Sequence, residues 1–290
     1  MLSGGGNKGA YQAGVLFHLL QDRRTHYDII CGVSVGALNG AYLAMYARGE
    51  EGRAAEGLRE LWTTITPDDV YKHWPLGLLQ GLWKSSFFNS SPLRSLISRT
   101  LDLGAIRNAR RQLRVGATCI SSGSYQVFDQ NCDYIVDAVK ASAAFPGAFE
   151  PVALPAGGIW MDGGVRETTP IGAAVSAGAT SIDVIVTSPG YSAPFHAKKP
   201  RALEMMVRAV EVMSDEVLAN DLEVTKRINQ LVQTGRAQGM REISLQVIRP
   251  ASPLVHDLLD FRTSTCAQLF ARGHNEALQT LRGNLLPDRA

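Results

Sequence analysis

Short apolar runs alternate with stretches of helical periodicity along the whole chain. Residues 27–31 and 182–187 have the length and the continuous apolar character of buried strands. Between such runs apolar residues recur at helical spacing, as at Tyr11, Val15 and Leu19. Strands that alternate with helices favour an α/β fold with three layers, α/β/α, and a mostly parallel central sheet. The predicted strands are 27–31, 113–120, 125–128, 159–161, 182–187 and 243–248, and the predicted helices are 7–21, 34–47, 133–144, 171–177, 202–234 and 264–282.

Two segments stand out from this alternation. Residues 70–97 are strongly apolar and are broken by several prolines and glycines. They could form a cap over a site for acyl chains, or a second layer of core beneath a long loop. Residues 202–234 carry apolar side chains at helical spacing, among them Met213 and Leu218, and we expect this stripe to pack into the core.

Composition narrows the class of protein. Of the 290 residues, 45% are hydrophobic and 19% charged, which is ordinary for a globular protein. The net charge of +2 gives no electrostatic reason to expect a nucleic-acid partner. Four scattered cysteines without ligand spacing disfavour a zinc site, so neither a metal nor a cofactor is predicted. No signal peptide or apolar run of membrane-spanning length is visible, so we expect a protein that is cytoplasmic or peripheral to a membrane.

The first candidate for chemistry is Gly32-Val33-Ser34-Val35-Gly36, which follows a predicted strand and opens a predicted helix. A tight strand-turn-helix exposes a serine Oγ at its tip, and the flanking glycines remove side chains that would clash there. The backbone N–H after the serine then lies at a helix N-terminus, where negative charge is favoured. The alternative interpretation is a glycine-rich turn that merely contains a serine.

A glycine loop, Ser3-Gly4-Gly5-Gly6-Asn7-Lys8-Gly9, precedes the first predicted helix. Its backbone N–H groups could bind a phosphate or a developing oxyanion equally well. Gly4, Gly6 and Gly9 match the dinucleotide pattern G-x-G-x-x-G, but no strand of ordinary length precedes them. A Walker loop does not fit, because Gly9 follows Lys8.

The third candidate, Asp162-Gly163-Gly164, follows the apolar run 159–161 and could also be a plain Asp-Gly turn. A hydrolytic serine normally uses a histidine base. His196, His256 and His274 follow Asp162 in the order serine, acid, histidine. In α/β-hydrolases, however, the serine turn comes after several strands, whereas here it follows a single strand–helix unit.

Together and in this order, the three motifs resemble those of the patatin-like phospholipase family: a Gly-Gly-Gly-x-Arg/Lys-Gly loop, Gly-x-Ser-x-Gly, and Asp-Gly-Gly or Asp-Gly-Ala. Secondary similarities include residues 91–94, 141–146 and 149–152, and Pro170. The resemblance extends over about residues 1–280 and implies a single patatin-like catalytic domain, 1–290, with a C-terminal helical part, 202–290, packed on the core. The chain departs from the family in its nearly absent first strand.

What the resemblance implies is a catalytic dyad in which Ser34 is the nucleophile and Asp162 the base, without a histidine. The oxyanion hole would use backbone N–H groups of Gly4, Gly5, Gly6 and Asn7, and the motif is completed by Lys8, Gly9, Gly32, Gly36, Gly163 and Gly164. The expected substrate is a lipid or another ester, at a membrane surface or dispersed. Three alternatives stay open: a nucleotide-binding protein that uses the loop from Gly4 to Gly9, a lipid-binding member without turnover, and an acyltransferase.

Overall fold

The centre of the fold is a mixed sheet that is parallel in its middle. The computed structural model describes all residues except 76–82, 191–201, 237–238, 256 and 283–290. Strands β1 and β4 pair in parallel, as do β8 and β9, whereas β5, β6 and β7 add antiparallel pairs around β4. The strands of this sheet are β1 (Ile29–Val33), β4 (Gln112–Cys119), β5 (Tyr125–Asp129), β6 (Val152–Ala153), β7 (Ile159–Asp162), β8 (Ser181–Ile185) and β9 (Ser244–Ile248). A separate antiparallel pair is formed by β2 (Lys72–His73) and β3 (Phe88–Asn89).

A single residue joins the two halves of this sheet. Leu2 forms parallel bridges to Gly32 in β1 and to Ile185 in β8. Its N–H donates to the Cys31 carbonyl, and the N–H of Ser3 donates to the Ile185 carbonyl. This one bridging residue, followed by Ser3, fixes the glycine loop at the end of the sheet.

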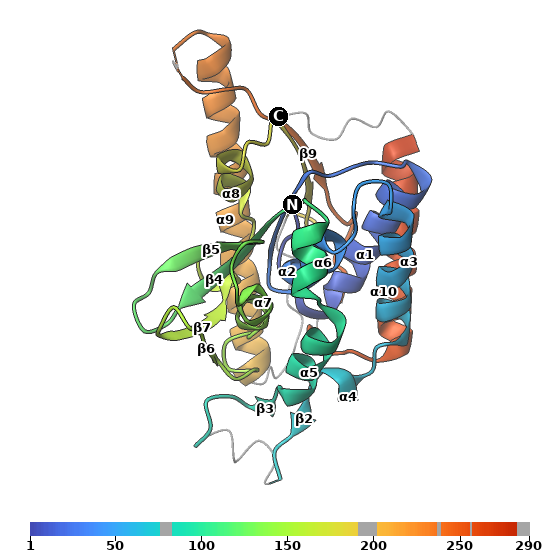
Figure 1. The fold of residues 1–290 in the computed structure, drawn as a ribbon, viewed down its shortest axis with the longest axis vertical. Coiled ribbons are helices and arrows are strands. Elements are labelled where there is room, and N and C mark those ends of the chain that lie inside the picture. Colours follow the sequence, from blue (N-terminus) through green and yellow to red (C-terminus); the bar gives the residue numbers. More distant parts are fainter. Residues whose placement is uncertain (76–82, 191–201, 237–238, 256, 283–290) are drawn as a thin grey trace.

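Helices cover both faces of the sheet, as the sequence predicts. One hydrophobic core lies against α1, α2, α3, α7 and α10, and a second lies between α8, α9 and strands β8 and β9. Figure 1 shows α8 and α9 on the side opposite to α1, α3 and α10. The helices are α1 (Gly9–Phe17), α2 (Val35–Ala44), α3 (Glu51–Thr64), α4 (Pro67–Val70), α5 (Ser91–Thr100), α6 (Leu103–Asn108), α7 (Ile135–Ser142), α8 (Ile171–Ser176), α9 (Ala202–Gln233) and α10 (Thr263–Arg282).

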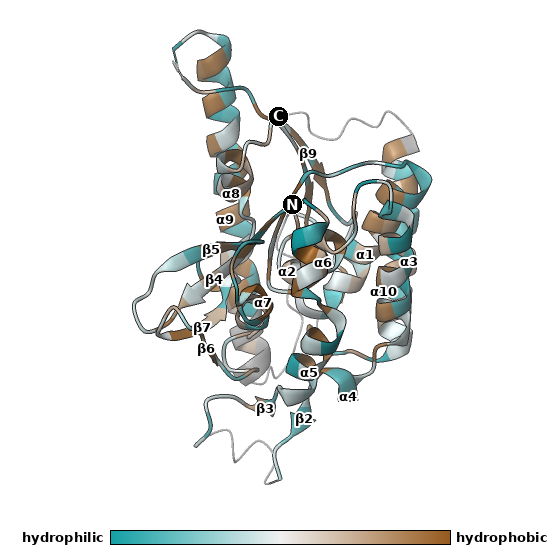
Figure 2. Cartoon of the chain, in the orientation of Figure 1, coloured by the Kyte–Doolittle hydropathy of each residue, from teal (hydrophilic) through white to brown (hydrophobic). Residues whose placement is uncertain are grey.

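The pattern of burial explains these layers. In β1, Ile30 belongs to one core while the next residue, Cys31, belongs to the other, because successive side chains of a strand point to opposite faces. Figure 2 shows hydrophobic residues along β9 and a mixture of hydrophobic and hydrophilic positions along the outer helix α9. The stripe predicted on α9 is buried at Leu218, but Met213 is 57% exposed, so the expectation of full core packing is wrong at Met213.

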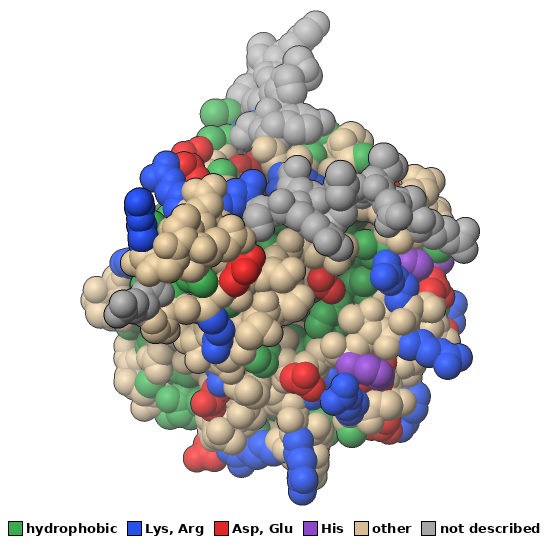
Figure 3. Space-filling view, turned by 90° about the horizontal axis from the view of Figure 1, so that it is seen from above, with side chains coloured by type: hydrophobic (Ala, Val, Ile, Leu, Met, Phe, Trp, Pro, Cys, Tyr) green, Lys and Arg blue, Asp and Glu red, His purple; other side chains and the backbone are tan. Residues whose placement is uncertain are grey.

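The surface carries charges of both signs. On the face drawn in Figure 3, basic and acidic side chains are interspersed with apolar ones. Of the helices in the described part of the chain, none is both long enough and apolar enough to cross a membrane.

Candidate active site

Ser34 stands at the turn between β1 and α2 in a strained backbone conformation. Its φ is 57° and its ψ is −129°, a combination that residues with a side chain rarely adopt. The turn is also crowded. A methyl group on Gly36 would overlap the Leu2 carbonyl oxygen, and one on Gly32 would overlap the carbonyl oxygen of Gly36. Both glycines of the Gly-x-Ser-x-Gly pattern are therefore required by the close approach of neighbouring backbone.

Ser142, at the end of α7, holds this turn in place. Its Oγ accepts a hydrogen bond from the Ser34 N–H at 2.9 Å and donates one to the Gly116 carbonyl at 2.6 Å. Ser142 is fully buried. The sequence contained a signal for it, since Ser142 lies in the secondary similarity at 141–146, but gave no indication of what it contacts.

Strand pairing brings Ser34 and Asp162 together. β1 runs parallel to β4 and its last residue, Val33, pairs with Gly116. β7 runs antiparallel to β4 and its last residue, Asp162, pairs with Ala117. Because β5 occupies the other edge of β4, β1 and β7 share one edge and meet there end to end. The residue after β1 and the last residue of β7 consequently lie side by side.

Asp162 is buried in a setting that raises its basicity. It is 3% exposed, and its Oδ1 accepts a hydrogen bond from the Gly164 N–H at 2.8 Å. Gly163 lies so close to the Gly116 carbonyl oxygen that a methyl group there would be 2.5 Å from it. Burial raises the pKa of Asp162 from 3.8 to about 6, although the hydrogen-bonding contacts of Ser34 and Gly164 oppose the shift.

The contact between the two side chains is close but not a well-formed hydrogen bond. The Ser34 hydroxyl is near enough to lower the pKa of Asp162, yet Oδ2 of Asp162 is buried and has no partner of good hydrogen-bond geometry among the described residues. Hydrogen bonds of this kind are often long or poorly aligned without substrate and shorten when it binds. Oδ2 of Asp162 is therefore unpaired in a carboxyl group that lies close to the Ser34 hydroxyl.

The glycine loop passes alongside Ser34. A methyl group on Gly4 would lie 3.2 Å from the Cβ and 3.8 Å from the Oγ of Ser34. The Gly4 N–H donates weakly to the Thr168 carbonyl at 3.4 Å. The N–H groups of Gly5 and Gly6 have no acceptor among the described residues, and their φ angles of 148° and 55° turn the backbone in a way that glycine tolerates best. These two N–H groups are the free donors of the loop.

Asn7, Lys8 and Gly9 have supporting positions. The backbone N–H of Asn7 donates to the Leu258 carbonyl at 3.0 Å, so it is already satisfied and is not a free oxyanion donor. Lys8 Nζ forms an ion pair with Glu211 on α9 at 2.7 Å. Gly9 allows the start of α1 to lie close to α2, because a methyl group on Gly9 would overlap the side chain of Val35.

An apolar cavity opens onto Ser34 and Asp162. Its volume of about 190 Å³ is more than ten times the ~10–15 Å³ that a single buried water needs, so it can hold part of a ligand. Most of its lining consists of aliphatic and aromatic side chains from α2, α3, α4, α5, α9 and the loops after α3, after α7 and before α10. They include Leu38, Leu61, Trp62, Ile65, Val70, Leu93, Leu96, Ile97, Phe145, Phe149, Leu218, Leu254, Leu258 and Phe261.

Only some residues of the apolar segment 70–97 are seen to line this cavity. Val70, Leu93, Leu96 and Ile97 line it. Trp83, in contrast, is 79% exposed. Residues 76–82, which include four leucines and two glycines of the pattern, lie outside the described residues. That this segment caps the site stays a prediction.

The histidines lie elsewhere. Among the described residues no histidine lines the cavity. His274 is on α10, where it contacts Asp22 rather than Asp162. His196 and His256 lie outside the described residues.

Comparison with known proteins agrees with the motifs. Residues 1–175 match the family described as Patatin-like phospholipase. A "cGAMP-activated phospholipase" of Pseudomonas aeruginosa (strain BWHPSA011 / Pa011) is 28% identical over 190 residues, which are 58% of this chain and 53% of that protein. The chain thus spans about half the length of this curated relative. Among solved structures, VipD from Legionella pneumophila gives a TM-score of 0.49 at 15% identity, covering 97% of this chain and 66% of the other.

Proposed function

Since the chain belongs to the patatin-like phospholipase family, we propose that it is a serine hydrolase that cleaves carboxylic esters of lipids through Ser34 and Asp162. The observation that carries this proposal is the meeting of a strained serine turn with a buried, partner-free carboxylate oxygen at an apolar cavity. Family membership supports lipid acyl hydrolysis in general. The assignment of the dyad rests on the geometry described above.

The reaction has two steps, acylation of Ser34 and hydrolysis of the acyl-enzyme, and Asp162 accepts and returns one proton in each. Ser34 Oγ attacks the ester carbonyl carbon while Asp162 takes the hydroxyl proton, and the leaving alcohol then recovers that proton from Asp162. A water next gives its proton to Asp162 and attacks the acyl group on Ser34. The fatty acid leaves, and Ser34 regains the proton. A carboxyl with a pKa of about 6 suits this role because it is ionised at neutral pH and more basic than an ordinary aspartate.

The free N–H groups of Gly5 and Gly6 would stabilise the tetrahedral oxyanion. Each such donor contributes about 3–4 kcal/mol in hydrolases where one has been removed. Gly5 and Gly6 line the same cavity as Ser34, and the preceding residue, Gly4, lies directly against the serine side chain. The N-terminus of α2 adds a favourable dipole at the same point.

The cavity favours an acyl chain over a nucleotide. Its lining is mainly apolar, which suits a fatty acyl chain. Lys8, the residue that would attract phosphates from the glycine loop, is paired with Glu211. The positive charge of Lys8 is therefore not free to bind a phosphate, and the N–H donors of the loop suit an oxyanion better.

The test is release of free fatty acid from phospholipid vesicles and from nitrophenyl esters of increasing chain length. We expect Ser34→Ala to remove turnover. Ser214→Ala is the matched control, because Ser214 lines the same cavity from α9, and it should retain activity. Full activity of Ser34→Ala would contradict the proposal. Binding of fatty acid without turnover by the unaltered chain would favour the lipid-binding alternative.

A further inference from the structure

Helices α1 and α10 cross in direct backbone contact. A methyl group on Gly14 would overlap the Phe270 carbonyl oxygen, and one on Gly273 would overlap the Tyr11 carbonyl oxygen. Two glycines thus face each other's helix where the two axes come closest. This contact brings the residues just beyond it on both helices unusually near to one another.

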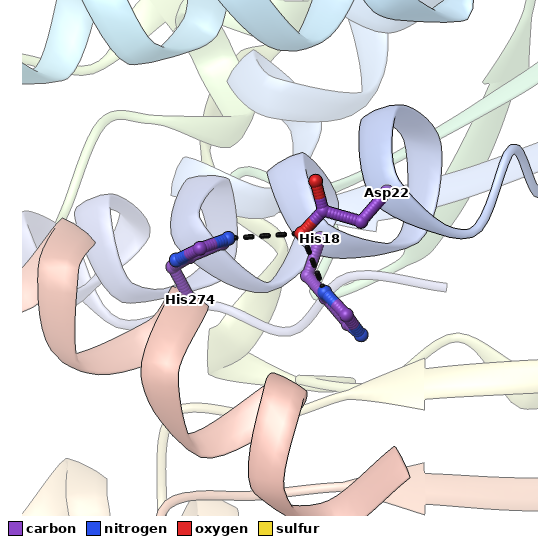
Figure 4. Close-up of side chains that lie close together, drawn as sticks. All are labelled: His18, Asp22 and His274. Carbon is purple, nitrogen blue, oxygen red and sulfur yellow. Dashed lines mark hydrogen bonds and ion pairs between the residues drawn. The ribbon is translucent and has the colours of Figure 1, made fainter. Parts of the chain in front are cut away.

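Next to the crossing, three side chains with metal-binding atoms converge (Figure 4). His18 Nδ1 lies 2.7 Å and His274 Nε2 lies 3.0 Å from the same oxygen, Oδ2 of Asp22. The three ligand atoms all lie within 4.8 Å of one another. In the described part of the chain, no other group of three histidine, cysteine or acidic residues comes together in this way.

The local backbone presents two of these groups together. Residues 18 and 22 are four apart, so their side chains emerge on the same face of the helix. This stretch is a π-helical turn, η2 (His18–Asp22), in which the Arg23 N–H donates to the His18 carbonyl five residues back. Single π-helical turns are rare and are frequently found at functional sites.

Aromatic contacts hold the imidazole ring of His274 in its orientation. The His274 ring packs edge-to-face against Phe17, with centroids 5.4 Å apart, and against His18 at 5.9 Å. His18 is almost fully buried, whereas His274 and Asp22 are 29% and 37% exposed at their side chains. The cluster is therefore fixed on its inner side and open to solvent on its outer side, where an ion and a water could enter.

We propose that His18, Asp22 and His274 form a binding site for a divalent transition-metal cation, with Zn²⁺ as the best match. Two imidazole nitrogens and one carboxylate oxygen are three of the four ligands of a tetrahedral Zn²⁺ site, and water completes the set. Binding replaces the two hydrogen bonds to Asp22 by metal–ligand bonds and requires the proton of each histidine to reside on its other ring nitrogen.

Such an ion would join α10 to the end of α1, far from the reacting groups. α1 begins directly after the glycine loop, but His18 lies near its other end, about 13–15 Å from Gly9 at 1.5 Å per residue. The ion would therefore be structural. The inference goes beyond the proposed hydrolysis and does not depend on it.

The experiment is titration of the untagged chain with Zn²⁺ by calorimetry, and with Co²⁺ by visible absorption. We expect one equivalent of Zn²⁺ to bind, and Co²⁺ to give the intense d–d bands of tetrahedral coordination. Asp22→Asn and His274→Gln keep each side chain polar and close to its original size but remove a ligand atom, so they should weaken binding by more than the ~10–100-fold that loss of an outer-shell partner causes. His73→Gln is the matched control, because His73 is exposed and lies outside the cluster; its affinity should be unchanged.

Two results would overturn the proposal. One is the absence of stoichiometric binding of Zn²⁺ and Co²⁺ by the unaltered chain. The other is binding whose affinity is the same in Asp22→Asn as in the unaltered chain. Because Asp22 is on the surface, this variant remains informative even if His274→Gln does not fold. Ester hydrolysis is measured separately and decides neither result.

Discussion

Replacing Asp162 by Asn is expected to stabilise the fold at neutral pH while it removes hydrolysis. Asp162 is buried, has no ion-pair partner among the described residues, and leaves one carboxylate oxygen without a well-formed hydrogen bond. Desolvation makes its charged form unfavourable. Asn removes the charge, and its carbonyl oxygen can still accept the hydrogen bond from the Gly164 N–H.

The magnitude follows from the pKa of Asp162, which rises from 3.8 to about 6 on folding. Below pH 3.8 Asp162 is protonated in both the folded and the unfolded state, so its charge then costs no folding stability. The cost develops as the pH rises from 3.8 to 6 and is complete above that. A shift from 3.8 to about 6 corresponds to about 3 kcal/mol at pH 8 and to about half of that at pH 5.

The assay is urea denaturation of the unaltered chain and of Asp162→Asn at pH 5 and pH 8. The stability gained by the variant should be larger at pH 8 by about 1–2 kcal/mol. Asp28→Asn is the control, because the Asp28 side chain is 81% exposed, and it should change stability little at either pH. Destabilisation by Asp162→Asn at pH 8, or an equal effect at both values, would refute the reasoning.

Three further predictions concern the same site. The kcat/KM for a neutral ester should fall about tenfold per pH unit below pH 6, because Asp162 must be ionised to accept the proton; a profile that is flat from pH 7 to pH 5 would exclude it as the base. Ser142→Ala should destabilise the fold by about 1–3 kcal/mol and lower kcat, because it leaves the buried Ser34 N–H without an acceptor; unchanged urea denaturation and kcat would argue against this. Leu96→Trp should reduce hydrolysis of long-chain esters more than of short-chain ones, because Leu96 lines the cavity; an equal reduction across a chain-length series would place the acyl chain elsewhere.

Much of the fold could be predicted because its signals are local. The apolar run at 113–120 forms β4 (Gln112–Cys119), and the helical pattern at 264–282 forms α10 (Thr263–Arg282). The small residues of 34–47 predict a helix that lies very close to neighbouring backbone. Gly36 confirms this, since a methyl group there would overlap the backbone at Leu2 and Ser3. The apolar or small character of each position sufficed in these cases.

What could not be predicted depends on long-range pairing. The sequence does not show that β1 and β7 meet on one edge of β4, which brings Ser34 beside Asp162. It equally gives no indication that Leu2 bridges β1 to β8. His18 and His274 are far apart in the chain and have no motif in common, so only the crossing of α1 and α10 brings them together.

The most direct measurement is covalent trapping with a long-chain fluorophosphonate, followed by peptide mass spectrometry. A single adduct on the residue 34 hydroxyl, strongly slowed by Asp162→Asn and absent in Ser34→Ala, is the predicted result. Modification of a different residue, or continued ester hydrolysis by Ser34→Ala, would contradict the claim that this serine and its neighbouring carboxylate perform the chemistry.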